Sequence, residues 1–489
     1  MSTIPWLTPL VPARRFALRA WLPALALVLV AAAGLAIFLA YPTYPAYDSL
    51  YSLLWAQELL DGTRPGFDGY RTPTEHPLLL PVGLVLAPFG EAGARLFIAL
   101  CFAGLIGLVA AMYRLGRLAA GPVGGFVAAG LLLTRFNFGL LASKGYLDVP
   151  YCAFVAWAMA LEAERPKRGG AVWWLLGLAG LLRPEAWLLA GLYGLWLGSG
   201  GVRNRVRVAL PALAAPGLWM ALDFAVTGNP LFSIQHTDAL AAELQREVPY
   251  GEIPRMTASL LVEVLKLPVL LLAVVGVLVA LRGRVRPLAV PGVVALVTLG
   301  TYLIIATGGL AGVYRYLLLT GIGGILFAAF SLAGWARLPA GSRLRAVWMG
   351  TAVFAVLAGG GYTATRLSAS GLVRQLEERP EVRAELNGLL ARPDVAAAAR
   401  CGTITVPNHK LLPEIRWALA LPADGVRARS DRTLDASAPG LAIVVRPPWD
   451  ETGTLNVYEV PADGTAIAAA PAGHALLART RRFEAWGRC

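Results

Sequence analysis

Long apolar runs recur along this chain and limit its fold more than any other feature of the sequence. A helix needs about 20 mostly apolar residues to cross a bilayer, so such runs predict transmembrane helices. The composition agrees, since 57% of the residues are hydrophobic and only 15% are charged, whereas soluble chains carry about 25% charged residues. We therefore expect an all-α polytopic membrane protein. The runs fall at about 21–40, 94–112, 120–139, 149–162, 208–226, 265–281, 288–307, 315–334 and 346–364.

The cations of the chain are grouped between these runs, and the formal net charge is +13. Short Lys and Arg clusters beside transmembrane helices mark the cytoplasmic side. This distribution is typical of topology signals and not of a groove for a phosphate backbone, so we expect no nucleic-acid partner. The N-terminal cluster indicates a retained first span and a cytoplasmic N-terminus. The clusters are Arg14, Arg15 and Arg19; Arg114 and Arg117; Arg165, Lys167 and Arg168; Arg203, Arg205 and Arg207; Arg282, Arg284 and Arg286; and Arg337, Arg343 and Arg345.

The run from 171 to 197 has cation clusters on both flanks, so both of its ends should lie in the cytoplasm. Arg183, Pro184 and Glu185 in its middle offer a reversal point, and we predict two short helices that meet there. This topology gives about eleven crossings. Segment 77–90 is short and broken by prolines, so we expect it to dip into the outer leaflet, with a tilted span as the alternative. The extracytoplasmic side then carries 41–93 (the first external loop), 140–150, 227–264, 308–314 and the residues after about 365.

The sequence becomes more charged after about residue 365 and contains short β-prone segments. We expect a transmembrane domain over 1–365 and a small extracytoplasmic α/β domain over 366–489. The expected elements of this second domain are strands at 401–407, 441–448 and 454–460 and a helix at 409–419.

The four cysteines fall into two groups. Cys401 and Cys489 lie in the expected extracytoplasmic domain, on the oxidising side of the membrane, and are candidates for a disulfide that ties the C-terminus to the first strand. Cys101 and Cys152 lie in apolar runs, and we expect them to be inert core residues.

Ionisable residues at the ends of apolar runs are costly and are candidates for function. Asp48 follows the first run in the sequence YPAYDS. It either caps the N-terminus of the next helix or takes part in chemistry. Glu75 and His76 stand directly before Pro77, where a cap of the loop is the alternative to a functional role.

Three further places carry such residues. Lys144 and Asp148 share a short external loop, and the alternative for them is a local ion pair, which would stabilise the fold little. For Arg183 and Glu185 the alternative is a structural ion pair at the reversal point. Arg315 begins an uncharged run on the external side, against the positive-inside trend. Its planar donors suit the phosphate of a lipid carrier, and the alternative is contact with ordinary lipid headgroups.

Several motifs occur in order and are all assigned to the external side. They are YDSLYSLLWAQELLDG with Asp48, HPLLLPVGLVLAPFG, KGYLDVP, GLLRPEAWLL, TGNPLFS at 227–233, and Tyr314-Arg315-Tyr316. With this set the chain resembles the GT-C superfamily of integral-membrane glycosyltransferases, which take sugars from polyprenyl-phosphate carriers. The resemblance covers most of the membrane region and looks closest to bacterial mannosyltransferase-like members. The chain departs from the pattern at Ser49, where many relatives have a second acidic residue, and at Pro77-Leu78, where relatives have a proline pair.

The resemblance implies an enzyme of the bacterial inner (plasma) membrane. It would move a sugar from a polyprenyl-phosphate donor to a glycan, lipid or protein acceptor in the cell envelope, with inversion and with Asp48 as the general base. A polyprenyl phosphate leaves without a general acid, so one carboxylate and several cations suffice, whereas glycosidases need two carboxylates. A divalent cation, Mg²⁺ or Mn²⁺, at Asp148 is an optional addition. The residues expected to bind the donor are Glu75, His76, Lys144, Asp148, Arg183, Glu185, His236, Tyr314 and Arg315.

Two other functional classes compete with this enzyme. A transporter or flippase of lipid-linked saccharides would place polar groups near the middle of the bilayer, often in repeated halves. The sequence has no such repeat, and its polar residues gather at one edge of the membrane. The third class is a structural or polymer-assembly membrane protein in which the C-terminal domain is the functional part.

Overall fold

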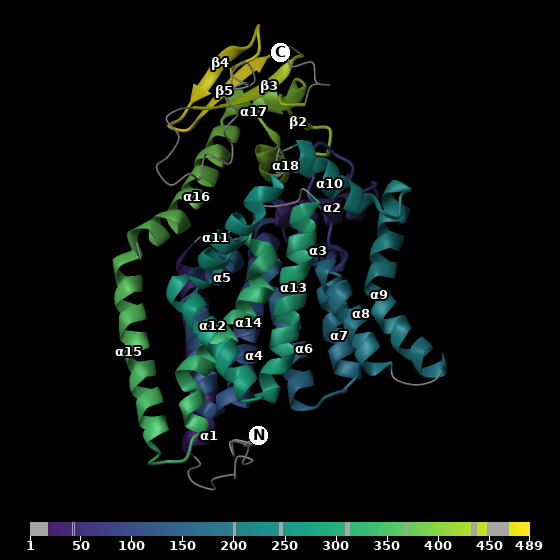
Figure 1. Ribbon diagram of the computed structural model, residues 1–489. Helices are drawn as coiled ribbons and strands as arrows, with labels where there is room; N and C mark the ends of the chain where they lie inside the picture. Colours follow the sequence, from purple (N-terminus) through teal and green to yellow (C-terminus); the bar gives the residue numbers. More distant parts are fainter. Residues whose placement is uncertain are drawn as a thin grey trace. The chain divides into compact units, whose positions relative to one another are not determined.

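The computed structural model describes residues 18–41, 43, 45–198, 202–243, 248–308, 313–366, 369–431, 438–446 and 469–489. Most of these residues are helical, and a small sheet follows near the C-terminal end of the sequence (Figure 1). The chain divides into two compact units. Unit 1 comprises Met1–Ile37, Ala99–Leu222 and Pro230–Leu367, and unit 2 comprises Phe38–Ile98, Asp223–Asn229 and Ser368–Cys489. Segment 41–93, which was expected to be the first external loop, therefore shares a unit with the C-terminal segment.

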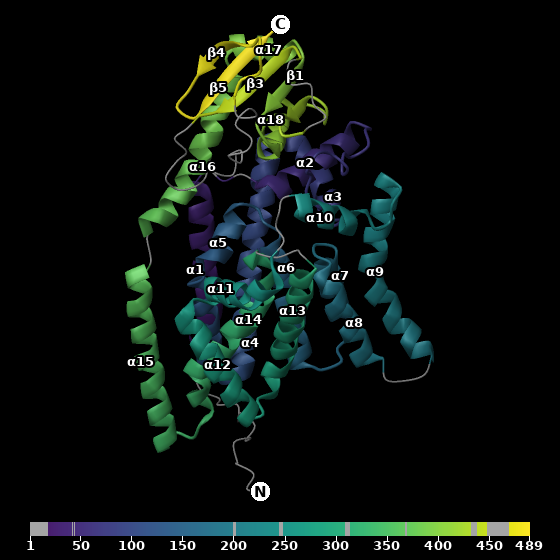
Figure 2. The same ribbon diagram turned by 45° about the horizontal axis from the view of Figure 1, so that its top comes forward.

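Unit 1 is a set of apolar helices, several of which run side by side (Figure 2). The helix α14 lies at its centre and is almost fully buried. Helix α4 is kinked at Ala120 and Gly121, where the φ angle of Gly121 is 70°. The helices that lie wholly or mainly in this unit are α1 Leu18–Ala40, α4 Gly90–Leu133, α5 Phe136–Ser143, α6 Asp148–Glu164, α7 Gly170–Gly180, α8 Glu185–Leu197, α9 Val202–Thr227, α10 Phe232–Glu243, α11 Ile253–Leu265, α12 Leu267–Arg282, α13 Ala289–Thr307, α14 Leu318–Ala333 and α15 Arg343–Arg366.

Small residues allow α14 to pack closely against its neighbours. A Cβ atom at Gly276 of α12 would lie 2.0 Å from the carbonyl oxygen of Phe327, and one at Gly323 would lie 2.6 Å from the Cβ atom of Ala295 in α13. Any larger residue at these two positions would force the helices apart. Close backbone approach through Gly and Ala is the usual way in which helices associate within a bilayer.

The number of crossings differs from the expectation. Among the described residues, six helices are long and apolar enough to span a membrane, or up to seven if the pair α11 and α12, bent by 99°, counts as one span. The expected count of about eleven is thus not confirmed. The two helices predicted around the reversal point are α7 and α8, with 11 and 13 residues, and each is shorter than a full span. They pack against each other and are separated by Leu181–Pro184.

The expected α/β character of the C-terminal segment is present in unit 2. The five-stranded sheet has the order β2-β1-β3-β5-β4. Strand β1 pairs in parallel with β2 and β3, whereas β3–β5 and β4–β5 are antiparallel. The elements of unit 2 are α2 Tyr47–Leu60, α3 Leu79–Leu86, α16 Ala369–Leu390, α17 Pro393–Arg400, β1 Thr403–Val406, α18 Leu412–Leu419, β2 Val426–Ala428, β3 Gly440–Val445, β4 Ala475–Arg479 and β5 Phe483–Arg488.

The predicted strands agree with part of this sheet. Those at 401–407 and 441–448 correspond to β1 and β3, and the strand predicted at 454–460 lies outside the described residues. The expected helix at 409–419 is a 3₁₀ turn, His409–Leu411, followed by α18. Helices α17 and α18 bury apolar residues of the sheet, so the C-terminal segment has a hydrophobic core of its own.

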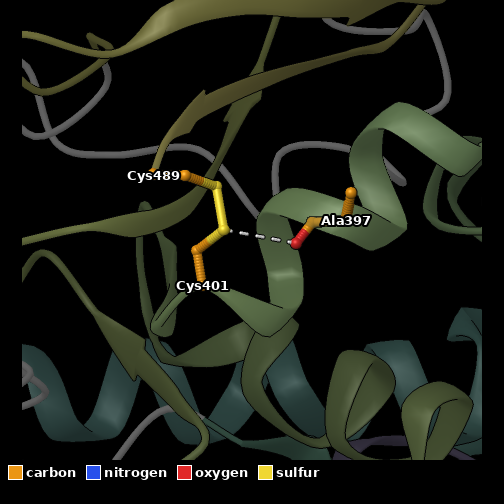
Figure 3. Close-up of a disulfide and its surroundings, with 3 residues drawn as sticks. All are labelled: Ala397, Cys401 and Cys489. Carbon is orange, nitrogen blue, oxygen red and sulfur yellow. Dashed lines mark hydrogen bonds between the residues drawn. A yellow bond between two sulfur atoms is a disulfide. The ribbon is translucent and has the colours of Figure 1, made fainter.

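A disulfide joins Cys401 to Cys489, with a Cα–Cα distance of 5.4 Å and 88 residues between the two in sequence (Figure 3). The Sγ atom of Cys401 also lies 3.5 Å from the carbonyl oxygen of Ala397 in α17. The bridge fastens the residue directly after β5 to Cys401, which lies two residues before the start of β1. The two other cysteines, Cys101 and Cys152, are free and buried.

Candidate functional site

Four of the predicted donor-binding residues come together in unit 1 around Asp148. This residue begins α6 and is only 1% exposed. Its Oδ1 atom accepts a hydrogen bond from Arg183 at 2.5 Å, and its Oδ2 atom accepts one from Arg315 at 3.3 Å. Arg183 also donates to Oε1 of Glu185 at 3.1 Å. Two cations and two carboxylates therefore form one neutral network, which stabilises charges that burial would otherwise make costly.

Aromatic rings hold both guanidinium groups of this network. The Arg315 guanidinium lies 4.6 Å from the ring centre of Tyr146, and that of Arg183 lies 5.4 Å from the ring of Tyr316. Such cation–π contacts are favourable and restrict the rotation of the side chain. Arg315 is the more accessible cation, because 27% of its side chain is exposed and only 13% of that of Arg183.

A small cavity of about 10 Å³ adjoins the network, between Glu185, Tyr302, Arg315 and Tyr316. That volume accommodates about one water molecule and no phosphate group. An anionic ligand would have to approach Arg315 from its exposed side.

The remaining predicted residues of unit 1 have different surroundings. Lys144 is the C-cap of α5, four residues before Asp148 begins α6, and Tyr314 and Arg315 belong to a 3₁₀ turn, Tyr314–Leu317. His236 lies in α10, where its ring stacks on that of Phe232 at 5.0 Å. Among the described residues, no group of three or more His, Cys, Asp or Glu side chains is arranged as a metal site.

Asp48 lies in unit 2 as the second residue of α2. The alternative in which it caps this helix is not observed, because the N-cap is Ala46 and no side-chain hydrogen bond caps it. Asp48 occupies the first turn, where a carboxylate interacts favourably with the helix dipole without serving as the cap. Its side chain is partly exposed, as a group that meets a substrate must be.

Residues that the sequence alone did not indicate surround Tyr47, the neighbour of Asp48, and two of them, Arg71 and Lys410, are cations. The Tyr47 hydroxyl donates to the carbonyl oxygen of Arg71 at 2.9 Å. The Lys410 ammonium lies 4.6 Å from the centre of the Tyr47 ring, and the ring of His409 meets it edge-on at 5.6 Å. Burial raises the pKa of Tyr47 well above its usual range, so the phenol stays protonated and can donate. The C-terminal segment thus packs directly on the residue that precedes Asp48.

Glu75 is buried in unit 2 and is only 2% exposed. The hydroxyl of Ser52 donates to its Oε2 atom at 3.4 Å, and its Oε1 atom has no hydrogen-bond partner among the described residues. Burial raises the pKa of Glu75 well above its usual range, and repulsion from Asp223 adds to the rise. A protonated carboxyl is the form that suits this apolar environment. Asp223 was overlooked in the sequence, although an acidic residue inside the apolar run 208–226 was a signal.

Three hydrogen bonds within unit 2 connect segment 41–93 to the C-terminal segment. Glu58 of α2 accepts a hydrogen bond from Arg416 of α18 at 2.5 Å. The Tyr70 hydroxyl donates to the carbonyl oxygen of Ser430 at 2.9 Å. Glu91 accepts from Arg383 of α16 at 2.9 Å. These bonds fix the segment that bears Asp48 against the C-terminal segment.

Comparison with solved structures finds the same fold in two crystal structures of the protein ArnT. The structure of ArnT from Cupriavidus metallidurans bound to undecaprenyl phosphate superposes with a TM-score of 0.58 at 14% identity, over 96% of this chain and 98% of that one. The apo state of ArnT superposes with a TM-score of 0.57 at 16% identity, over 95% and 98%. No family model and no curated protein sequence matches the chain. The fold expected from the GT-C resemblance is therefore confirmed.

Proposed function

We propose that this protein transfers a sugar from a polyprenyl-phosphate donor to an extracytoplasmic acceptor, with inversion at the anomeric carbon. The observation that carries the proposal is the fold shared with ArnT over 96% of the chain, together with the undecaprenyl phosphate bound in one ArnT structure. The proposed setting is the bacterial inner membrane, with a cytoplasmic N-terminus. Residues 1–365 would form the transmembrane domain and 366–489 an extracytoplasmic domain.

Asp48 is the proposed general base. A base must lie where the acceptor hydroxyl can reach it and must be basic enough to take the proton of that hydroxyl. Both oxygens of Asp148 accept hydrogen bonds from guanidinium groups, which makes that carboxylate a weak base and a good anchor for cations. Asp48 is partly exposed and lies in a first helical turn, so it suits the role better.

Arg315 is the proposed ligand of the donor phosphate. Asp148 and Tyr146 hold its guanidinium in place, so no rearrangement is needed when negative charge develops on the leaving phosphate. Asp148 would then position Arg315, and a divalent cation at Asp148 would first have to displace a guanidinium. The other residues proposed to bind the donor are Glu75, His76, Lys144, Arg183, Glu185, His236 and Tyr314.

The test is transfer by purified protein in lipid nanodiscs, with a panel of radiolabelled polyprenyl-phosphate sugars and an extract of envelope glycans and lipids. We expect a labelled product with the wild type and a loss of roughly 10²–10⁴-fold in rate for Asp48→Asn. Asp68→Asn, which changes an exposed carboxylate of the same loop, is the matched control. Substantial turnover by Asp48→Asn would refute the base assignment. Movement of the donor across the bilayer without any product would indicate the transporter instead.

A further inference from the structure

A groove of about 740 Å³ lies within unit 2. The end of α2, the start of α4, the end of α16 and helix α18 form its walls. Its volume is within the range of about 300–1,000 Å³ that is typical of sites for small ligands. The first external loop and the C-terminal segment both contribute to it, so the groove exists only when the two are packed together.

The polar lining of the groove is largely unused by the protein itself. Across the described part of the chain, the side chains of Gln57, Asp61 and Asn387 make no hydrogen bond or ion pair. Glu91 accepts from Trp417 and Arg383, and both bonds use its Oε1 atom. Its Oε2 atom is left to face the groove or solvent. Two amides and two carboxylates thus offer several acceptors and donors to a ligand.

The rest of the lining is apolar. Leu60, Pro88, Leu390 and Leu419 contribute hydrocarbon surface next to those polar groups. Alternation of apolar surface with carboxylates and amides matches a pyranose ring, which presents C–H faces and equatorial hydroxyls together. A hydrocarbon chain would cover Gln57, Asp61 and Asn387 without offering them a hydrogen-bond partner, at a cost in free energy for each.

The charge of the lining excludes anionic ligands. No Lys, Arg or His is found among the described residues that line the groove, and two of them, Asp61 and Glu91, are acidic. Arg383 neutralises Glu91 from one side, so the net charge that faces a ligand is close to that of Asp61 alone. A phosphate or a uronic acid would be repelled, and a strongly cationic peptide would meet a single unpaired carboxylate. A neutral saccharide fits this balance.

We infer that the groove binds a neutral saccharide segment of the acceptor. The inference rests on the proposed glycosyl transfer and names the chemical class of its acceptor. It also gives the C-terminal segment a function, since α16 and α18 supply Asn387 and Trp417.

Binding is measured without any donor, on the full chain in nanodiscs, by saturation-transfer NMR and titration with mannotriose and maltotriose. We expect at least one of these probes to bind and a trigalacturonate probe to bind at least tenfold more weakly. Ala391→Trp and Ala418→Trp place an indole in the groove at two exposed positions and should each abolish binding. Ala384→Trp, at an exposed position of α16 outside the lining, should leave binding unchanged.

Each result decides the inference separately from the proposed function. Failure of both neutral probes to bind, binding that survives both tryptophan variants, or preference for a polylysine or a lipid probe would overturn the groove assignment. Transfer activity could still be intact in all of these cases. Conversely, saccharide binding that is lost in both groove variants would uphold the groove even if no polyprenyl-phosphate sugar is ever used as donor.

Discussion

The buried ion pair between Glu58 and Arg416 should hold the helix that carries Asp48 in place. The two side chains are 11% and 5% exposed, and their closest atoms are 2.5 Å apart. Glu58 accepts a second bond at 2.8 Å from the backbone N–H of Gly66, so one carboxylate joins α2, the following loop and α18. Arg416 also lies beside Tyr51, where its charge opposes the rise in the Tyr51 pKa that burial causes.

Replacing Arg416 by Met removes the cation and keeps most of the side-chain volume. The Glu58 carboxylate then remains buried without its charged partner, which costs about 3–5 kcal/mol in comparable pairs. Because Glu58 belongs to α2, the loss of the ion pair should lower the free energy that is needed to open α2. A difference of that size corresponds to a roughly 10²- to 10⁴-fold rise in the exchange rate of its amides.

Hydrogen exchange, followed by mass spectrometry on peptides that cover 47–60, measures this opening directly. The matched control is Arg64→Met, which breaks an exposed pair with Asp68 in which the side chains are 57% and 55% exposed. That change should cost about 0–1 kcal/mol and alter exchange less than tenfold. The double variant Glu58→Gln/Arg416→Met should cost less than the sum of the two single variants.

Two results would refute this reasoning. The first is an exchange rate of α2 in Arg416→Met that equals that of Arg64→Met, since burial would then contribute nothing. The second is strict additivity in the double variant, which would mean that the two side chains do not interact. If the reasoning holds, Arg416→Met should also slow transfer, although Arg416 itself contacts no substrate in the proposed site.

Three further predictions follow from other contacts. Because the folded pKa of Glu75 is raised, the stability that its protonated form provides is present below about pH 4.3 and is lost as pH rises through the folded pKa. The melting temperature of Glu75→Gln should therefore fall less at alkaline pH than the melting temperature of the wild type, with Asp61→Asn as the exposed control. Arg315→Lys should raise the donor KM and lower kcat, because a lysine loses the planar geometry that binds Asp148 and phosphate together; equal kinetics across a donor titration would favour simple headgroup contact. Reduction of the Cys401–Cys489 bridge should destabilise the C-terminal segment by roughly 4–5 kcal/mol, given a loop of 88 residues, and unchanged proteolysis of that segment under reducing conditions would contradict this.

The sequence alone was enough to identify the class of the protein. Transfer of apolar side chains out of water is a local property of each run, so composition and periodicity predicted a helical membrane protein without any contact being known. The same holds for the α/β character of the C-terminal segment. Two of its strands, β1 and β3, were predicted from short β-prone runs. The number of membrane crossings could not be predicted in the same way, because hydropathy does not show how far short helices such as α7 and α8 enter the bilayer.

Which charges meet one another was decided only by the tertiary structure. Asp148 binds one arginine 35 residues away and another 167 residues away, and Arg416 reaches Glu58 across 358 residues. The sequence identified several of these residues as ionisable groups that are costly to place in apolar runs. It could not show which residue pairs with which, since the pairing depends on how the helices pack. For Arg416 and Lys410 it gave no signal at all, because a charged residue in a polar segment is ordinary. Burial explains the difference: it turns an ordinary side chain such as Glu75 into an unusual one, and burial is a property of the packed chain.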